Sequence, residues 1–416
     1  MCTSTLLYTL LLVSVGLTIS GCETTDKALT AAGRVARGQT GQAIIDLASG
    51  KDPAQIAKRR LDQYARDPEA LVRDLREAKK DFEAILAVLG VNVGKTWGKK
   101  EVQLPERKKY VKYTQNYKSR AIVDFDSAEI LVETLDDQDP QKSLKNAIVT
   151  TLLTPQDPRS VDLFSDKEIV LTDDKEPYLF GLVLDQRNKP IRLPEEAEPF
   201  AAYLLEKNYA TRVVDQDGTK KTVHYVTMDM VSNLPMKQAE KYRALVHQFA
   251  QQYNISPSLV FAVIRTESNF NPYAVSSAPA YGLMQLVPTS GGREAYRKAK
   301  GQDVIPSRDY LFDPENNVEL GTAFLNVLMF NQLEAVDHNV SREYCVIAAY
   351  NTGAGNVFRT FSRDRTTAVN QINSLQPAGV YDQLRKNLPY EETRSYLEKV
   401  TGYRKSFINS SESSNQ

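Results

Sequence analysis

Cysteine is scarce in this sequence of 416 residues, which contains only Cys2, Cys22 and Cys345. Cys2 and Cys22 lie at the two ends of an apolar N-terminal segment and Cys345 stands alone, which argues against a fold held together by disulfides. The three histidines are scattered and form no His-Glu-x-x-His pattern. These absences argue against zinc-finger or metalloprotease chemistry, and we expect neither a metal nor a cofactor.

An excess of charge of either sign is also absent, because 52 Lys and Arg residues balance 52 Asp and Glu residues. The chain therefore has no large electrostatic field that would recruit nucleic acid, and no nucleic-acid partner is expected. Its length is too great for one ordinary hydrophobic core, which predicts two domains behind a short leader.

Long apolar runs are limited to residues 6–19, a stretch shorter than the roughly 20 residues of a membrane-spanning helix. It leads into Ser20-Gly21-Cys22, where small residues precede a cysteine and polar residues follow. This pattern is similar to a bacterial lipoprotein signal, so residues 1–21 are expected to be a signal peptide and Cys22 the lipidated residue. Glu23 after the cysteine favours the periplasmic face of the outer membrane. The alternative is an ordinary cleaved signal.

The first half of the mature chain has the pattern of an α+β domain. Residues 22–52 are small, polar and rich in glycine, as in a tether, and residues 53–89 show the spacing of amphipathic helices that end near Gly90. After Trp97 come short strands, of which the first two and the last two are predicted hairpins. The predicted strands cover residues 121–125, 130–134, 180–184, 212–214 and 222–226, and the predicted helices cover residues 141–153 and 195–208. Residues 53–233 are expected to form this domain.

Beyond Met236 the strand signals disappear and an all-α domain is predicted for residues 234–405, followed by a disordered tail, 406–416. Ser256 before Pro257 and Asp313 before Pro314 are typical helix starts, with a capping residue ahead of a first-turn proline. The predicted helices cover residues 237–253, 256–267, 314–331, 341–350, 380–387 and 391–400.

Glu267 is the candidate for catalysis. Residues 259–264 are apolar on nearly every face of their helix, which predicts burial, and Glu267 follows on the face shared by Val263 and Ile264. A carboxyl group at the end of a core helix is desolvated. Desolvation should raise its pKa and keep a proton available for donation near neutral pH.

Three motifs follow in order: Glu267-Ser-x-Phe-x-Pro-x-Ala-x-Ser, Gly282-Leu-Met-Gln and Ala349-Tyr-Asn-x-Gly. Together they resemble the catalytic domain of the lysozyme-like lytic murein transglycosylases over residues 240–400. Segments of the N-terminal half resemble the N-terminal domain of a membrane-bound branch of that family. These segments are residues 97–105, 108–113, 119–120, 147–153 and 189–192. The resemblance implies an α+β N-terminal domain followed by an all-α lysozyme-like catalytic domain.

In this family one glutamic acid protonates the glycosidic oxygen between N-acetylmuramic acid and N-acetylglucosamine of peptidoglycan. It then removes the proton of the muramic C6 hydroxyl, which closes a 1,6-anhydro ring without a second carboxylate. No Asp or Glu occurs in residues 268–293, which favours this reaction over that of a hydrolytic, goose-type muramidase. A non-catalytic peptidoglycan-binding lipoprotein is the second alternative. Glycan strands are the expected partner, and proteins of cell-wall synthesis or division are further candidates.

The resemblance also implies substrate-binding residues around Glu267. Ser268 is expected to orient Glu267, and Tyr273 and Tyr281 are interpreted as sugar-stacking rings because a pyranose face is apolar enough to pack on them. Met284 and Gln285 are expected to line the cleft, and Tyr350 and Asn351 to hold the acetamido group of the sugar. Tyr396 is expected to be the family's tyrosine near the acid. The basic run 107–109, followed by interleaved tyrosines, is expected to be a solvated face, with contact to wall polymer or lipid headgroups as the alternative.

Overall fold

The computed structural model describes residues 68–171, 176–216, 218–276 and 280–413. The chain divides into two compact units, residues 1–88 and 89–416. The predicted signal peptide, Cys22, the tether and residues 53–67 of the amphipathic segment lie outside the described residues. Within the described ranges, no helix combines the length and the apolar character that crossing a membrane requires.

Helix α5, Pro68–Trp97, is the first described element, and it runs through the predicted stop at Gly90. The stop comes instead at Gly98, whose φ of 89° favours glycine. A side chain there would also bring Cβ to 2.8 Å from the Asp215 carbonyl oxygen. Gly90 was the wrong choice because a glycine within a long helix ends it only where the backbone reverses.

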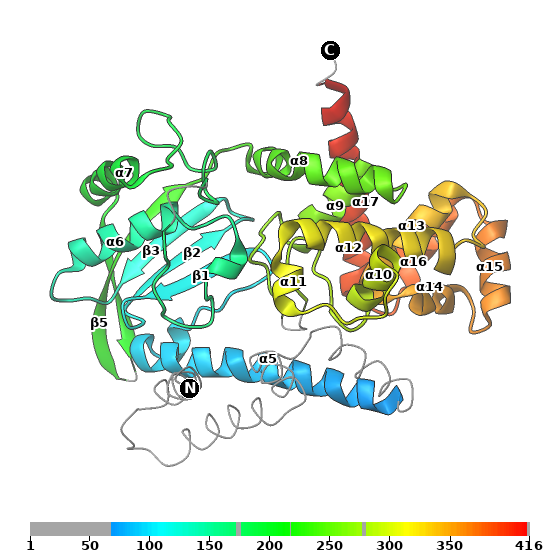
Figure 1. Ribbon diagram of the computed structural model, residues 1–416, viewed down its shortest axis with the longest axis horizontal. Coiled ribbons are helices and arrows are strands. Elements are labelled where there is room, and N and C mark those ends of the chain that lie inside the picture. Colours follow the sequence, from blue (N-terminus) through cyan, green and yellow to red (C-terminus); the bar gives the residue numbers. More distant parts are fainter. Residues whose placement is uncertain (1–67, 172–175, 217, 277–279, 414–416) are drawn as a thin grey trace, which may run out of the picture. The chain divides into compact units, whose positions relative to one another are not determined.

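A five-stranded antiparallel sheet follows, in the order β1-β2-β3-β5-β4 (Figure 1). Both predicted hairpins are confirmed. The strands are β1 Lys109–Thr114, β2 Ser119–Asp124, β3 Glu129–Thr134, β4 Ala210–Gln216 and β5 Thr219–Asp229. The strand predicted at 180–184 is wrong: Gly181 has a φ of 70° there, and the segment makes turns with isolated bridges.

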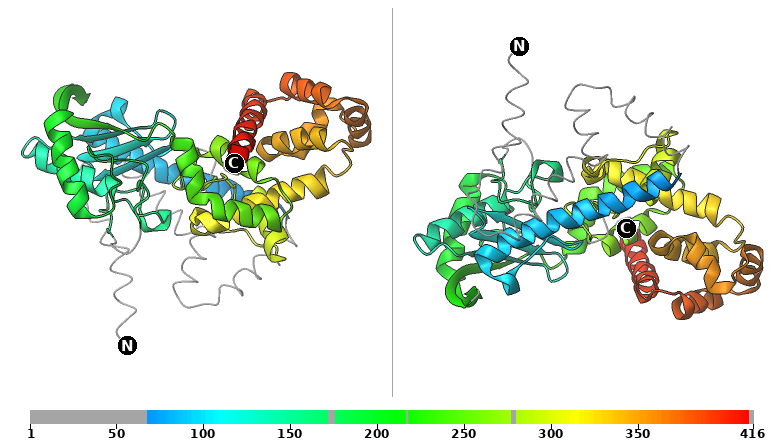
Figure 2. Two further views of the ribbon diagram at one scale, coloured as in Figure 1. Left: turned by 90° about the horizontal axis from the view of Figure 1, so that it is seen from above. Right: turned by 90° about the horizontal axis from the view of Figure 1, so that it is seen from below.

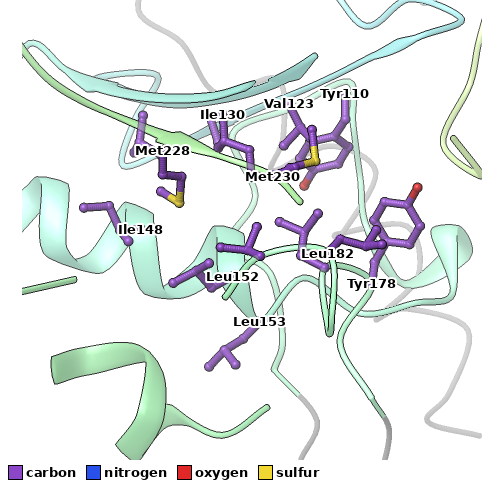
Figure 3. Close-up of a cluster of buried hydrophobic side chains, with 14 of the residues drawn as sticks. Tyr110, Val123, Ile130, Ile148, Leu152, Leu153, Tyr178, Leu182, Met228 and Met230 are labelled. Carbon is purple, nitrogen blue, oxygen red and sulfur yellow. The ribbon is translucent and has the colours of Figure 1, made fainter. Parts of the chain in front are cut away.

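Helices α6, Pro140–Leu152, and α7, Pro194–Lys207, agree with the predicted helices and cover one face of this sheet (Figure 1). Short 3₁₀ turns lie at Lys99–Glu101 and Pro158–Ser160. Apolar side chains from strands and helices meet in one cluster (Figure 3), which includes Val123, Ile130, Ile148, Leu152 and Met228. A second cluster on the sheet surrounds the indole of Trp97.

β1 corrects the expectation of a solvated basic face with interleaved tyrosines. Tyr110 and Tyr113 are buried in the two clusters, and Lys112 is buried between them in sequence, with its ammonium donating to the Ser165 carbonyl at 2.8 Å. The alternation of a strand sends Tyr110 and Tyr113 to opposite faces of the sheet. These rings are therefore unavailable to wall polymer or lipid headgroups.

The all-α prediction for the C-terminal half is confirmed. Its helices are α8 Leu234–Gln252, α9 Pro257–Glu267, α10 Gly291–Lys300, α11 Arg308–Phe312, α12 Pro314–Val327, α13 Asn339–Thr352, α14 Ala354–Phe361, α15 Arg365–Ser374, α16 Pro377–Asn387 and α17 Glu391–Ser413. A π-helical turn, Leu328–Gln332, continues α12. Below, the sheet half means residues 99–229 and the helical half residues 234–413.

α17 continues through residues 406–413, where a disordered tail was expected. The reason is packing: Phe407 is buried, with its ring 5.3 Å from that of Phe261 in α9. α9 and α17 lie side by side over much of their length (Figures 1 and 2). α17 thus supports the helix that ends in Glu267.

Candidate active site

Glu267 is the last residue of α9, and its side chain is only 7% exposed. Residues 259–264 of α9 are buried as the sequence predicted, because these apolar residues face neighbours on several sides. The chain reverses directly after the acid, where Asn269 and Phe270 have φ values of 48° and 60°. Positive φ is unfavourable for a phenylalanine, so surrounding contacts must hold this turn.

Those contacts come from the sheet half. The Asn269 amide donates to the Phe125 carbonyl at 2.5 Å, and the Tyr178 hydroxyl donates to the Phe270 carbonyl at 3.0 Å. The Asn271 amide donates to the Arg107 carbonyl at 3.2 Å. Three successive residues after Glu267 are thereby fixed to the sheet half, which fixes the end of α9.

Burial raises the pKa of Glu267 to about 7, and four neighbours modify this effect. The Tyr396 hydroxyl on α17 and the positive charges of Arg107 and Lys108 lower the pKa, whereas the negative charge of Glu392 raises it. Arg107 lies 3.7 Å from Glu267, measured from Nη1 to Oε2. A carboxyl group with a pKa near 7 can both give and take a proton at neutral pH.

Tyr396 and Tyr350 complete the surroundings of the carboxyl group. Burial raises the pKa of both phenols well above the usual value, and the neighbouring Glu267 charge raises it further. The Tyr396 hydroxyl makes no hydrogen bond with good geometry to any described residue, although it lies near enough to the carboxylate to lower its pKa. The Tyr350 hydroxyl donates to the Met284 carbonyl at 2.8 Å.

Ser268 does not orient the Glu267 carboxylate, which corrects the prediction. Its hydroxyl is buried and faces the Leu283 carbonyl at 2.7 Å and the Ile264 carbonyl at 3.1 Å. The side chain therefore joins the end of α9 to the Gly282-Leu-Met-Gln turn. These two contacts hold the two motifs together.

The Gly282-Leu-Met-Gln turn is fixed by Asn317 of α12, which the sequence reasoning missed. The Asn317 amide donates to the Tyr281 and Leu311 carbonyls at 2.8 and 2.7 Å, and its Oδ1 accepts from the Met284 N–H at 2.8 Å. Gly282, with a φ of 74°, leaves room for it: a Cβ there would lie 2.5 Å from the Asn317 amide nitrogen.

Met284 and Gln285 are more buried than the prediction of cleft-lining residues implied. Met284 is fully buried and packs on Gly321, where any Cβ would overlap its sulfur. The Gln285 amide donates to the Ala274 and Gly282 carbonyls, both at 3.0 Å, while its Oε1 has no partner among the described residues. Both side chains stabilise the turn itself.

The two tyrosines expected to stack on sugars are buried. Tyr273 belongs to the core of the sheet half: its ring contacts Tyr110 and Tyr178 edge-on, and its hydroxyl donates to the Pro155 carbonyl. Tyr281 packs against Phe312, with ring centroids 5.3 Å apart. Neither ring presents a face on which a pyranose could lie.

Asn351 lines a pocket of about 630 Å³ beside the acid. Its Oδ1 accepts from the Thr393 hydroxyl at 2.6 Å, which fixes the amide. The same pocket is lined by Glu392 and by Tyr390, whose ring is largely exposed. Glu267 does not line this pocket. Arg107 connects the pocket with Glu267, because its Nη2 lies 3.1 Å from Oε1 of Glu392, which lines the pocket. From the sequence, Arg107 is recognised only as part of the basic run 107–109, with no link to Glu267, and no role is assigned to Glu392 or Tyr390.

No cluster of His, Cys, Asp or Glu with the arrangement of a metal site occurs in the described part of the chain. Cys345 is buried, and burial raises the pKa of its thiol to about 12, so it is not a nucleophile. The chemistry of the site rests on one buried carboxyl group, its two tyrosines and the ions around it.

The helical half matches the Transglycosylase SLT domain over residues 244–373, which defines its class. Residues 72–241 match the N-terminal domain of membrane-bound lytic murein transglycosylase C. Proteins of that name from Yersinia enterocolitica and from Klebsiella pneumoniae subsp. pneumoniae are 42% and 43% identical to the chain. The matches cover 82% of this chain in both cases and 92% and 91% of theirs. The chain belongs to the membrane-bound lytic murein transglycosylase C family.

Among solved structures, the 70-kDa soluble lytic transglycosylase from Escherichia coli matches 39% of this chain and 23% of its own, with 27% identity and a TM-score of 0.30. Family membership makes this protein a lytic transglycosylase that cleaves peptidoglycan, as the three sequence motifs predicted. The family match also confirms the predicted fold class.

Proposed function

We propose that Glu267 carries out both proton transfers of the cleavage. As the acid, it gives its proton to the oxygen that joins N-acetylmuramic acid to N-acetylglucosamine while the C1–O bond breaks. As the carboxylate, it then takes the proton of the muramic C6 hydroxyl, whose oxygen bonds to C1 and closes a 1,6-anhydro ring. The observation that carries this proposal is a buried carboxyl group whose pKa is raised to about 7.

The internal hydroxyl removes the need for a base that activates water. Glu392 is an acidic residue whose charge raises the pKa of Glu267, but the Arg107 guanidinium pairs with it at 3.1 Å. Paired in this way, Glu392 is a poor candidate for the second catalytic carboxylate of a hydrolase. Asn351, fixed by Thr393, is the amide best placed to bind an acetamido group in the neighbouring pocket.

Mass spectrometry of the soluble products tests this reaction. Digestion of purified cell-wall sacculi in water enriched in ¹⁸O should give fragments that end in 1,6-anhydro-muramic acid and carry no ¹⁸O at the new end. A goose-type lysozyme run in parallel gives labelled reducing ends and serves as the control. If this protein also yields labelled reducing ends as the main product, the hydrolytic alternative is correct.

We further propose that Cys22 carries a lipid that anchors the enzyme to the periplasmic face of the outer membrane. Support comes from the Ser20-Gly21-Cys22 sequence after an apolar run and from the word "membrane-bound" in the names of the relatives. In Cys22→Ala, the enzyme should leave the membrane fraction or remain as an uncleaved precursor. Density-gradient separation of inner and outer membranes, with Cys345→Ala as the matched control, measures this. Unchanged fractionation of Cys22→Ala would refute lipid anchoring.

A further inference from the structure

Arg107 is a charged residue of the sheet half that forms an ion pair with the acid. Its Nη1 lies 3.7 Å from Glu267 Oε2 and its Nη2 lies 3.1 Å from Glu392 Oε1, so one guanidinium bridges two carboxylates of the helical half. The Arg107 side chain is 42% exposed, so solvent reaches this bridge. A residue that served folding alone would not need to reach the acid of the reaction.

The backbone of Arg107 is held firmly. Its carbonyl accepts from the Asn271 amide at 3.2 Å, and the carbonyl of the next residue, Lys108, accepts from the Phe125 N–H at 3.0 Å. The guanidinium therefore starts from a fixed point that is tied to the turn following Glu267. A charged group stabilises the charge that develops during a reaction most effectively when its position is already fixed.

We propose that Arg107 is a positioning residue of the active site: it holds the Glu267 carboxylate in place and stabilises its negative charge once the proton has passed to the substrate. The proposal rests on the function assigned to Glu267 above. In the reaction the protonated acid becomes a carboxylate when it donates its proton, so the Arg107 charge favours that step over the protonated acid. The sheet half is in this view a part of the active site.

The other charged and titratable groups that face Glu267 are few among the described residues. Lys108 comes from the same segment as Arg107 but pairs with Asp126 at 3.0 Å. α17 supplies Glu392 and Tyr396, and α13 supplies Tyr350. Arg107 is distinguished from Lys108 by its direct contact with the carboxylate.

The test is the pH dependence of kcat/KM on a soluble peptidoglycan fragment, measured from pH 5 to 9 on the full-length enzyme. Activity needs protonated Glu267, so it should fall as the pH rises through the pKa of about 7. Arg107→Met removes a charge that lowers this pKa, so the fall should move to higher pH by about half a unit or more. Glu392→Gln removes a charge that raises it, so the fall should move to lower pH.

At pH 5, where the acid is protonated in every variant, Arg107→Met should also lose about threefold to tenfold in kcat/KM, because the forming carboxylate has lost its counter-ion. Arg107→Lys should recover part of this loss. The matched control is Arg159→Met, which removes another half-exposed arginine that pairs across the two halves, with Asp313 at 3.1 Å. Arg159→Met should leave the pH profile of kcat/KM unchanged.

Thermal melting curves of all four variants separate loss of fold from loss of positioning. If Arg107→Met and Arg159→Met have the same pH profile as the wild type, the proposal for Arg107 is wrong even when Glu267→Gln is inactive. If Glu267→Gln is active, the function proposed for Glu267 is itself wrong, whatever the result for Arg107. An equal shift in Arg107→Met and Arg159→Met would also overturn the specific role of Arg107.

Discussion

Glu267→Gln is expected to abolish cleavage of peptidoglycan, with a loss of about 10³-fold or more in the release of soluble fragments from purified sacculi. Glutamine has the size and shape of glutamic acid but can neither give a proton to the glycosidic oxygen nor take one from the C6 hydroxyl. Because the same group is proposed for both transfers, no other acid of the site can replace it. Chromatography of released fragments over several hours measures the residual rate.

The fold should survive this change. Burial disfavours the ionised form of the Glu267 carboxyl group, and the substitution replaces it with a neutral amide. Glu343→Gln is the matched control: Glu343 is a largely buried acid of α13 that pairs with Arg404 of α17 at 2.6 Å, and burial raises its pKa as well. It should retain nearly full activity. Residual activity of Glu267→Gln within tenfold of the wild type would instead support a non-catalytic role for the acid.

Glu267 could be predicted from the sequence because its environment is local. The apolar residues of α9 determine that the helix is buried, and the acid follows them on the same face, so desolvation could be inferred before any tertiary structure was known. The α6, α7 and hairpin predictions succeeded for the same reason. Each rests on a repeat of three to four residues or of two residues within one short segment.

The partners of Glu267 could not be predicted in this way. Arg107 is 160 positions away in the sequence, and only the pairing of β1 with β2 and the contacts of Asn269 and Asn271 bring it to the acid. Tyr273 was misread because an aromatic next to a catalytic motif can face a ligand or a core, and its sequence neighbours do not distinguish them. Contacts with Tyr110 and Tyr178 decide for the core.

Asn317 illustrates a further kind of residue that local patterns miss. It lies in α12, far along the chain from the turn that it holds, and nothing in its own helix marks it except burial of an amide. Fully buried amides are costly unless their hydrogen bonds are satisfied. The Asn317 side chain hydrogen-bonds to the Tyr281 carbonyl and the Met284 N–H at the Gly282-Leu-Met-Gln turn and to the Leu311 carbonyl of α11. The carbonyls of Leu283 and Met284 in this turn accept from the hydroxyls of Ser268 and Tyr350.

Asn317→Asp should therefore destabilise the protein by about 3 kcal/mol and lower Tm by several degrees. The Met284 N–H keeps its acceptor, but a carboxylate oxygen would replace the amide nitrogen that lies 2.8 and 2.7 Å from the Tyr281 and Leu311 carbonyls. A protonated acid could still donate once, so the native state would raise the pKa of the new carboxyl group. Its destabilising effect should be present at pH 7 and diminish as the pH falls towards about 4.

Activity should fall together with stability in this variant, by about tenfold or more at a temperature where the chain is still folded, because the turn positions Ser268 and Tyr350 around the acid. Asn316→Asp provides the control: Asn316 is only half-buried and lies in the first turn of α12, where a negative charge is favourable. Urea unfolding and turnover, compared between the two variants, measure both effects. Equal stability and equal turnover of Asn316→Asp and Asn317→Asp would show that the three hydrogen bonds of Asn317 do not hold the site together.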